Sequence, residues 1–86
     1  MNTKEFELAK VNVLISPGEM LKILRELQEL TQNQLAEATG ISQSNISSME
    51  TNAKNIGRDR ALILARALRV HPAVILFPDY QVEAAW

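Results

Sequence analysis

The sequence has no cysteine and only one histidine, His71, and these absences exclude several kinds of site. Without cysteine there is neither a disulfide nor a thiolate nucleophile. With a single histidine, a zinc site would need carboxylates for most of its ligands, so we expect no metal. The sequence also lacks a phosphate-binding glycine loop and a nucleophile paired with a base, so we expect no cofactor and no catalytic residue. The chain is therefore not predicted to be an enzyme.

Long apolar runs are absent as well. No stretch approaches the roughly 18 apolar residues that a membrane-spanning helix needs. The first ten residues alternate lysines and glutamates with other residues, unlike the basic start and apolar stretch of a secretory signal. We therefore expect a cytoplasmic protein with no membrane partner. Its 86 residues, 47% of them hydrophobic, suffice for one helical core.

The formal net charge is only −1, although non-specific DNA affinity comes mostly from lysine and arginine. The distribution of charge matters more than its total. Between residues 39 and 60 three cations, Lys54, Arg58 and Arg60, outnumber two anions, Glu50 and Asp59. If the protein binds DNA, we expect modest affinity per monomer.

Helix start signals recur along the chain. Ser16 and Thr31 each have a glutamate or glutamine three residues later, which is a capping box, and proline follows Ser16 directly. The apolar residues after each signal recur at intervals of three and four. This pattern predicts helices at about 17–29 and 32–39.

A third start signal follows after a short turn. Gly40 ends the second helix, and Ser42 caps a helix at about 43–51 whose buried positions are Ile46 and Met49. The other face of that helix carries amides and hydroxyls. Asn52 stands where the chain leaves the helix and is expected to adopt the left-handed conformation.

Two more helices are predicted toward the C-terminus. The segment 58–70 is apolar around most of its circumference, so we expect it to be largely buried. His71 and Pro72 open a short helix at about 72–77. The domain is thus predicted to span 16–78. Apolar residues alternate in 10–15 and 80–86, so the flanking segments 1–15 and 79–86 have two possible structures. They form short strands that pair with each other or across a dimer, or they are frayed tails.

Two short helices joined by a tight turn are the geometry of a helix-turn-helix. The sequence resembles the Cro/CI-type, or XRE, family of phage and bacterial repressors between residues 17 and 77. The residues that carry the resemblance are Leu24, Arg25, Leu30, Thr31, Gln32, Leu35, Ala36, Gly40, Ile41, Ser42, Gln43, Ile46, Ser47 and Glu50. The resemblance implies an all-α, five-helix domain that dimerises on double-stranded DNA and inserts its third helix into the major groove.

The resemblance also assigns residues to roles. Base contacts are expected from Gln43, Ser44, Asn45 and Ser48, because amides and hydroxyls can bond base edges. Phosphate contacts are expected from Gln32, Ser42, Ser47, Lys54, Arg58 and Arg60. Arg25 and Glu50 fall where the family usually has a partly buried ion pair. The usual Glu-Asn-Gly after the third helix is Glu50, Thr51 and Asn52 here, which leaves the path of the loop that carries Lys54 open.

Three functions fit these features. The first is a homodimeric repressor that binds a palindromic operator. The second is the antitoxin of a type II toxin–antitoxin pair, with a toxin protein as partner, because residues 16–21 look like the start of HigA-type antitoxins. The third is a protein-interaction module of the same fold that does not bind DNA. The modest charge favours it, whereas the polar third helix argues against it.

Overall fold

The computed structural model describes residues 15–79 of the chain. Within that range it has five helices, in agreement with the predicted fold class: α2 (Pro17–Leu27), α3 (Gln32–Thr39), α4 (Gln43–Glu50), α5 (Arg58–Leu68) and α6 (Pro72–Leu76). Except for Ile15, the two predicted terminal strands lie outside the described residues. None of the described helices has the length and apolar character to cross a bilayer.

The helices begin where the sequence places caps. The Ser16 and Thr31 side chains accept hydrogen bonds from the backbone N–H of Glu19 and Gln34, whose own side chains accept from the backbone N–H of the two caps. Ser42 caps α4 in the same way through the Asn45 N–H. These bonds satisfy backbone donors that a helix N-terminus leaves unpaired.

Helix α3 ends at Thr39 as predicted, whereas the other four helices end one or two residues earlier than predicted. Helix α2 ends at Leu27 rather than near residue 29, and α5 ends at Leu68 rather than near residue 70. In each case a residue other than glycine takes the left-handed conformation, Glu29 at φ 57° and Arg69 at φ 59°. The next residue then bonds back to the fifth carbonyl before it, which ends the helix. The sequence gives no glycine signal at either position.

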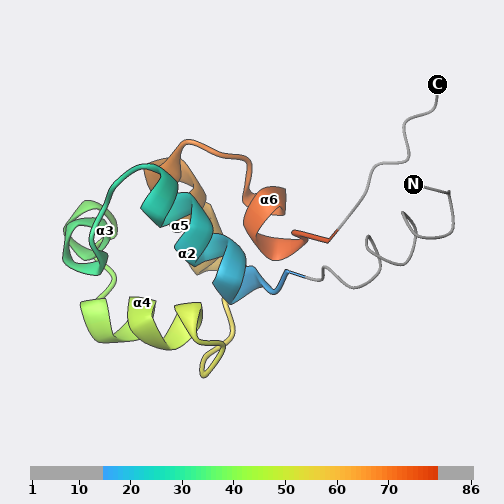
Figure 1. Ribbon diagram of the computed structural model, residues 1–86, viewed down its shortest axis with the longest axis horizontal. Helices are drawn as coiled ribbons and strands as arrows, with labels where there is room; N and C mark the ends of the chain where they lie inside the picture. The colour runs from blue at the N-terminus through green and yellow to red at the C-terminus, as the bar shows by residue number, and fades with distance from the viewer. Residues whose placement is uncertain (1–14, 80–86) are drawn as a thin grey trace, which may run out of the picture.

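The five helices surround one core, and each contributes to it. The fully buried large side chains are Leu21, Leu35, Ile46, Met49, Leu64, Leu68 and Ile75. Helix α4 packs on α2 and α3, and α6 packs on α5 and α2. Figure 1 shows α3 and α4 together at one side of the bundle and α6 on the other side of α2. The two short helices are thus presented at one end of the bundle by a common core.

Helix α5 is less buried than its composition suggests. Ala61, Leu64 and Ala65 are buried, whereas Leu62 and Ile63 are 47% and 44% exposed. The prediction of a largely buried helix is therefore wrong for Leu62 and Ile63. A five-helix bundle covers only one side of α5, so its remaining apolar residues face outward.

The start of α2 approaches the end of α4 so closely that only glycine fits at position 18. A Cβ on Gly18 would lie 2.2 Å from the Met49 carbonyl oxygen and 2.6 Å from Asn52 Oδ1. The first of these is a backbone atom, which cannot swing aside as a side chain can. This contact fixes the distance between α2 and the C-terminal end of α4.

We predict that Gly18→Ala destabilises the protein by about 1–3 kcal/mol, because the added methyl group overpacks this contact. Helix propensity alone would give the opposite sign, since alanine is favoured over glycine inside a helix by about 1 kcal/mol. Urea unfolding of the two proteins measures the difference. The control is Gly57→Ala, where the added Cβ meets nothing within 4 Å; because Gly57 is the N-cap of α5, only the loss of a favoured cap residue is expected there, at most about 1 kcal/mol. A stabilised Gly18→Ala protein would show that the contact is loose.

Candidate nucleic-acid interface

The candidate interface is built on α3, α4 and the turn between them. The turn depends on Gly40, which is left-handed at φ 76°, a conformation that glycine adopts without strain. Ile41 is buried against the core, and Ser42 then caps α4. Helix α4 is held from below by Ile46 and Met49, both fully buried as predicted. Its opposite face is left to solvent.

The outward face of α4 consists of uncharged polar residues. Ser44 lies near its centre, between the partly exposed Ser47 and Ser48, because these positions are opposite Ile46 and Met49 on a helix of 3.6 residues per turn. Gln43 lies at one edge of this face and Asn45 at the other. The four predicted base-contacting residues, Gln43, Ser44, Asn45 and Ser48, therefore share one surface with Ser47.

A buried ion pair joins α4 to α2. The Arg25 Nε and Nη2 atoms donate to the two Glu50 carboxylate oxygens at 2.6 and 3.0 Å, and Arg25 Nη1 donates to the Leu30 carbonyl oxygen at 2.7 Å. The Arg25 and Glu50 side chains are only 10% and 2% exposed. Two parallel N–H···O bonds hold the guanidinium and the carboxylate in one plane.

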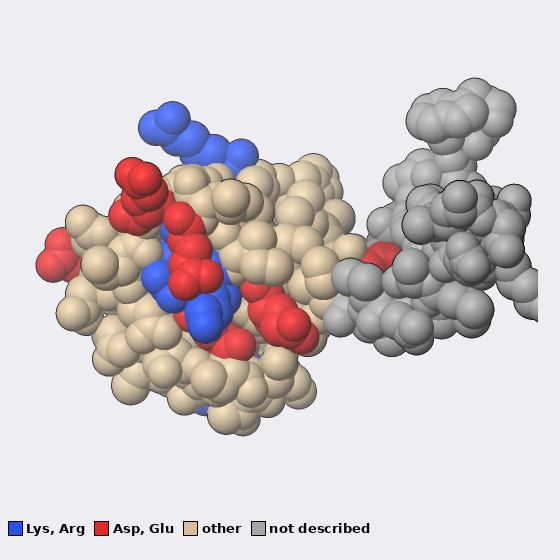
Figure 2. All heavy atoms as spheres, in the orientation of Figure 1, with Lys and Arg blue, Asp and Glu red and all other residues tan. Residues whose placement is uncertain are grey.

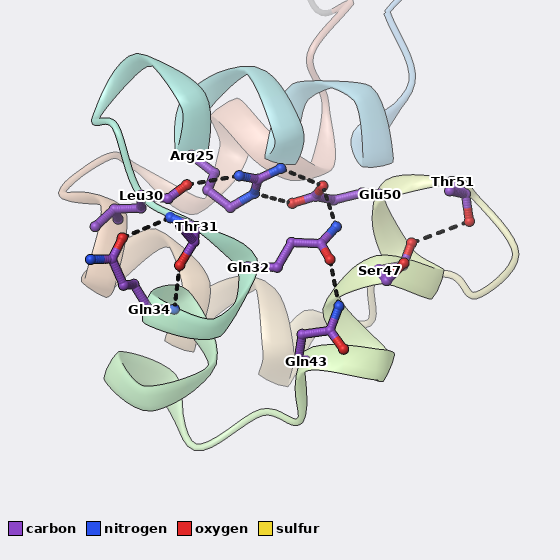
Figure 3. Close-up of polar contacts among 9 residues, drawn as sticks. All are labelled: Arg25, Leu30, Thr31, Gln32, Gln34, Gln43, Ser47, Glu50 and Thr51. Carbon is purple, nitrogen blue, oxygen red and sulfur yellow. Dashed lines mark hydrogen bonds and ion pairs between the residues drawn. The ribbon is translucent and has the colours of Figure 1, made fainter.

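The same carboxylate begins a chain of hydrogen bonds that reaches the surface of α4 (Figure 3). Gln32 Nε2 donates to Glu50 Oε1 at 3.0 Å, and Gln43 Nε2 donates to Gln32 Oε1 at 2.6 Å. An ionised carboxylate only accepts, so the Gln32 amide must turn its nitrogen to Glu50 and its oxygen to Gln43. Gln32 was predicted to hold a phosphate; here it also orients Gln43.

The Glu50 carboxyl is kept ionised by its partners. Its burial would raise the pKa, but the hydrogen bonds from Arg25 and Gln32, with the positive charges of Arg25 and Lys22, outweigh burial and lower the pKa of Glu50. The pKa of the Arg25 guanidinium is raised, chiefly by its hydrogen bond to Glu50. Both groups are therefore charged at neutral pH.

The predicted phosphate-contacting cations separate in space. Lys54 lies beside α4, where its Nζ donates to Asn45 Oδ1 at 2.7 Å. Arg60 is half-buried in the first turn of α5. Arg58 lines a groove between α5 and α6 with Leu62 and Phe77. Of the three, Lys54 alone has a described hydrogen bond to α4. The contact between Lys54 and Asn45 was missed by sequence reasoning, because it depends on the path of the intervening loop.

The visible charge lies mainly off the outward face of α4. Figure 2 shows lysine, arginine, aspartate and glutamate mixed over α2, whereas the surface where α4 runs is mostly uncharged. The exposed charged residues of α2 include Lys22 and Glu26. The interface therefore offers hydrogen-bonding groups more than net charge, which suits recognition of base edges better than non-specific attraction to phosphates.

Comparisons with known proteins agree with this geometry. Residues 21–75, more than half of the chain, match the family described as Helix-turn-helix. The restriction-modification controller protein C.AhdI from Aeromonas hydrophila is 30% identical over 70% of this chain and 91% of its own, with a TM-score of 0.67. The P22 c2 repressor, solved with a synthetic operator, is 25% identical over 74% of this chain and 97% of its own, with a TM-score of 0.70. No curated protein matches the sequence closely enough to count as a relative.

We predict that Glu50→Gln lowers the free energy of unfolding at pH 7 by about 3 kcal/mol, because it leaves the buried Arg25 charge without its counter-ion. The pKa of Glu50 is lowered in the folded protein, so its contribution is present above the ordinary glutamate value of about 4.3 and is lost as the pH falls through the lowered value. The difference between wild type and variant should therefore shrink in acid. Urea unfolding between pH 7 and pH 3 measures it.

The matched control is Glu37→Gln at an exposed position of α3, which should change stability by less than about 0.5 kcal/mol. A difference between wild type and Glu50→Gln that stays constant from pH 7 to pH 3 would contradict the role of an ionised Glu50.

Proposed function

The chain belongs to the XRE-type helix-turn-helix family and is a DNA-binding transcriptional regulator; from that premise we propose that it is a homodimeric repressor that reads a palindromic operator with α4. The observation that carries the proposal is the outward face of α4, where Ser44, Ser47 and Ser48 lie between two amides whose orientations are set by neighbouring side chains. Such a face can bond base edges in the major groove.

The rival function, a module of the same fold that does not bind DNA, fits this face poorly. The exposed apolar residues include Leu27, Leu62, Ile63 and Phe77, which belong to α2, α5 or the end of α6. A protein-binding surface centred on α4 would need aromatic or aliphatic residues in place of its serines and amides. The polar face of α4 and the apolar faces elsewhere support separate roles.

Dimerisation is proposed to use the α5–α6 side. An apolar groove of about 560 Å³ is lined there by residues that include Leu62, Leu76 and Phe77, and Phe77 is 62% exposed. Helix α6 packs on α5 and α2, so this groove leaves the face of α4 free for DNA. A second copy is the occupant we propose, because α4 has no lysine or arginine and one monomer would bind DNA weakly.

The antitoxin prediction, with a toxin protein as partner, has weaker support. It was suggested by residues 16–21, and in the structure Ser16 and Glu19 form a capping box while Gly18 packs against the end of α4. Helix capping and packing account for these residues without a toxin. The polar face of α4 supports a repressor, and we propose that its own promoter is among the sites that it binds.

We predict that the protein prefers DNA from its own promoter over random DNA and that Gln43→Ala combined with Asn45→Ala lowers this preference by about 100-fold, because two base-contacting amides are lost. Fluorescence anisotropy at several salt concentrations gives both affinities, and binding should weaken steeply with salt. The control removes two exposed amides outside α4, Asn33→Ala with Asn55→Ala, and should keep the preference. A double variant at α4 with unchanged preference would exclude base reading by these two amides.

We predict that Phe77→Asp converts the dimer to a monomer, because it removes the apolar ring from the groove and would bury a carboxylate there, and the neighbouring Arg58 would not offset the desolvation of that charge. Sedimentation equilibrium measures the mass, and binding to a full operator should fall to that of a half-site. Leu27→Asp is the control, since Leu27 is similarly exposed at 74% but lies at the C-terminal end of α2. If Phe77→Asp remains a dimer, the interface lies elsewhere.

A further inference from the structure

The two amides that flank the outward face of α4 are held in different ways. Asn45 Oδ1 accepts from Lys54 Nζ at 2.7 Å. A lysine ammonium has three donors and no acceptor, so the Asn45 amide must turn its oxygen to Lys54 and its nitrogen away from it. At the opposite edge, Gln43 gives one N–H to Gln32, and its oxygen has no hydrogen-bond partner among residues 15–79.

The position of Lys54 is fixed by the loop that carries it. The Lys54 backbone N–H donates to the Ser48 carbonyl oxygen at 3.1 Å, which folds the loop back onto α4. Asn52 is left-handed at φ 64°, and its Nδ2 donates to Ser16 Oγ at 3.0 Å. The loop is thus fastened both to α4 and to the start of α2, and the ammonium is held beside Asn45 before DNA arrives.

The two amides therefore offer different groups to a base. Gln43 can offer its oxygen and its second N–H, neither of which is bonded within the described part of the chain, and this pair bonds the N6 amino group and N7 of adenine. Asn45 offers its two N–H groups, and Lys54 has two further N–H donors next to them. Guanine is the base whose major-groove edge carries two adjacent acceptors, N7 and O6.

We infer that Lys54 is a specificity-determining residue. Because it holds the Asn45 oxygen, Asn45 and Lys54 together recognise guanine rather than adenine. The Asn45 oxygen has a second lone pair, but an adenine amino group that approached it would also meet the lysine ammonium. The charge of Lys54 and the donor pattern of Asn45 and Lys54 therefore both favour guanine over adenine. This inference rests on the proposed reading of DNA by α4 and adds the base that one edge of α4 recognises.

The test is selection of duplexes from a random pool by four full-length proteins: wild type, Asn45→Ala, Lys54→Met and Lys22→Met. The base-pair position at which Asn45→Ala loses its base preference is the position that Asn45 reads. Wild type should select guanine at that position. Lys54→Met should lower the ratio of guanine to adenine affinity at that position by about 10-fold, because the freed amide can pair with adenine. Lys22→Met removes the same charge from an exposed position of α2 and should leave the ratio of guanine to adenine affinity unchanged.

Two results would overturn the inference alone, and a third would overturn the proposed function on which it rests. Wild type could select adenine at that position, or Lys54→Met could weaken binding to all sequences equally with the ratio unchanged, as loss of a phosphate contact would. If wild type selects no sequence, the proposed function fails first.

The contact itself is tested without DNA. In the free protein, Lys54→Met should shift the NMR signals of the Asn45 side-chain amide, whereas Lys22→Met should not. Unshifted signals in Lys54→Met would show that the pair does not form. Thermal unfolding of each variant establishes that it is folded, which we expect because Lys54 is exposed.

Discussion

The ion pair between Arg25 and Glu50 is the constraint on which the interface depends. One guanidinium bonds both the carboxylate at the end of α4 and the Leu30 carbonyl after α2. A buried charge without its partner is costly, so α2, α4 and the chain before α3 have one arrangement that satisfies all these groups. The close contact at Gly18 sets the distance between α2 and α4 at the opposite end of α2. The angle at which α4 is presented is therefore determined by interactions outside its recognition face.

This constraint also determines the donors and acceptors on the surface. Glu50 can only accept, which orients Gln32 and through it Gln43; Lys54 can only donate, which orients Asn45. Two charged groups, one buried and one exposed, thereby set opposite amide orientations at the two edges of α4. A helix without a charged side chain on its outward face still presents a fixed pattern, because free rotation of its amides would break these bonds.

The sequence predicted the features that depend on local chemistry. Caps at Ser16, Thr31 and Ser42 and the glycine turn at Gly40 are short-range signals, so helix starts were correct to the residue. The ends of α2 and α5 were placed too late, because Glu29 and Arg69 adopt the left-handed conformation without a glycine in the sequence to indicate it. The pairing of Arg25 with Glu50 came from family resemblance, whereas the Lys54 contact required the three-dimensional path of a loop. The exposure of Leu62 and Ile63 likewise depends on how many helices surround α5.

The position of Lys54 has a consequence for affinity. If Asn45 reads a base as proposed, the cation that holds its amide is less free to neutralise a phosphate, so its charge would serve selectivity at the expense of non-specific attraction. Arg58 lines the α5–α6 groove, and it has no hydrogen bond to α4 among the described residues. A protein with a net charge of −1 and such a distribution gains little from one α4 alone. In the proposed dimer, two copies joined through the apolar side of α5 and α6 would double the base contacts, and this gain in avidity is the physical argument for the dimer.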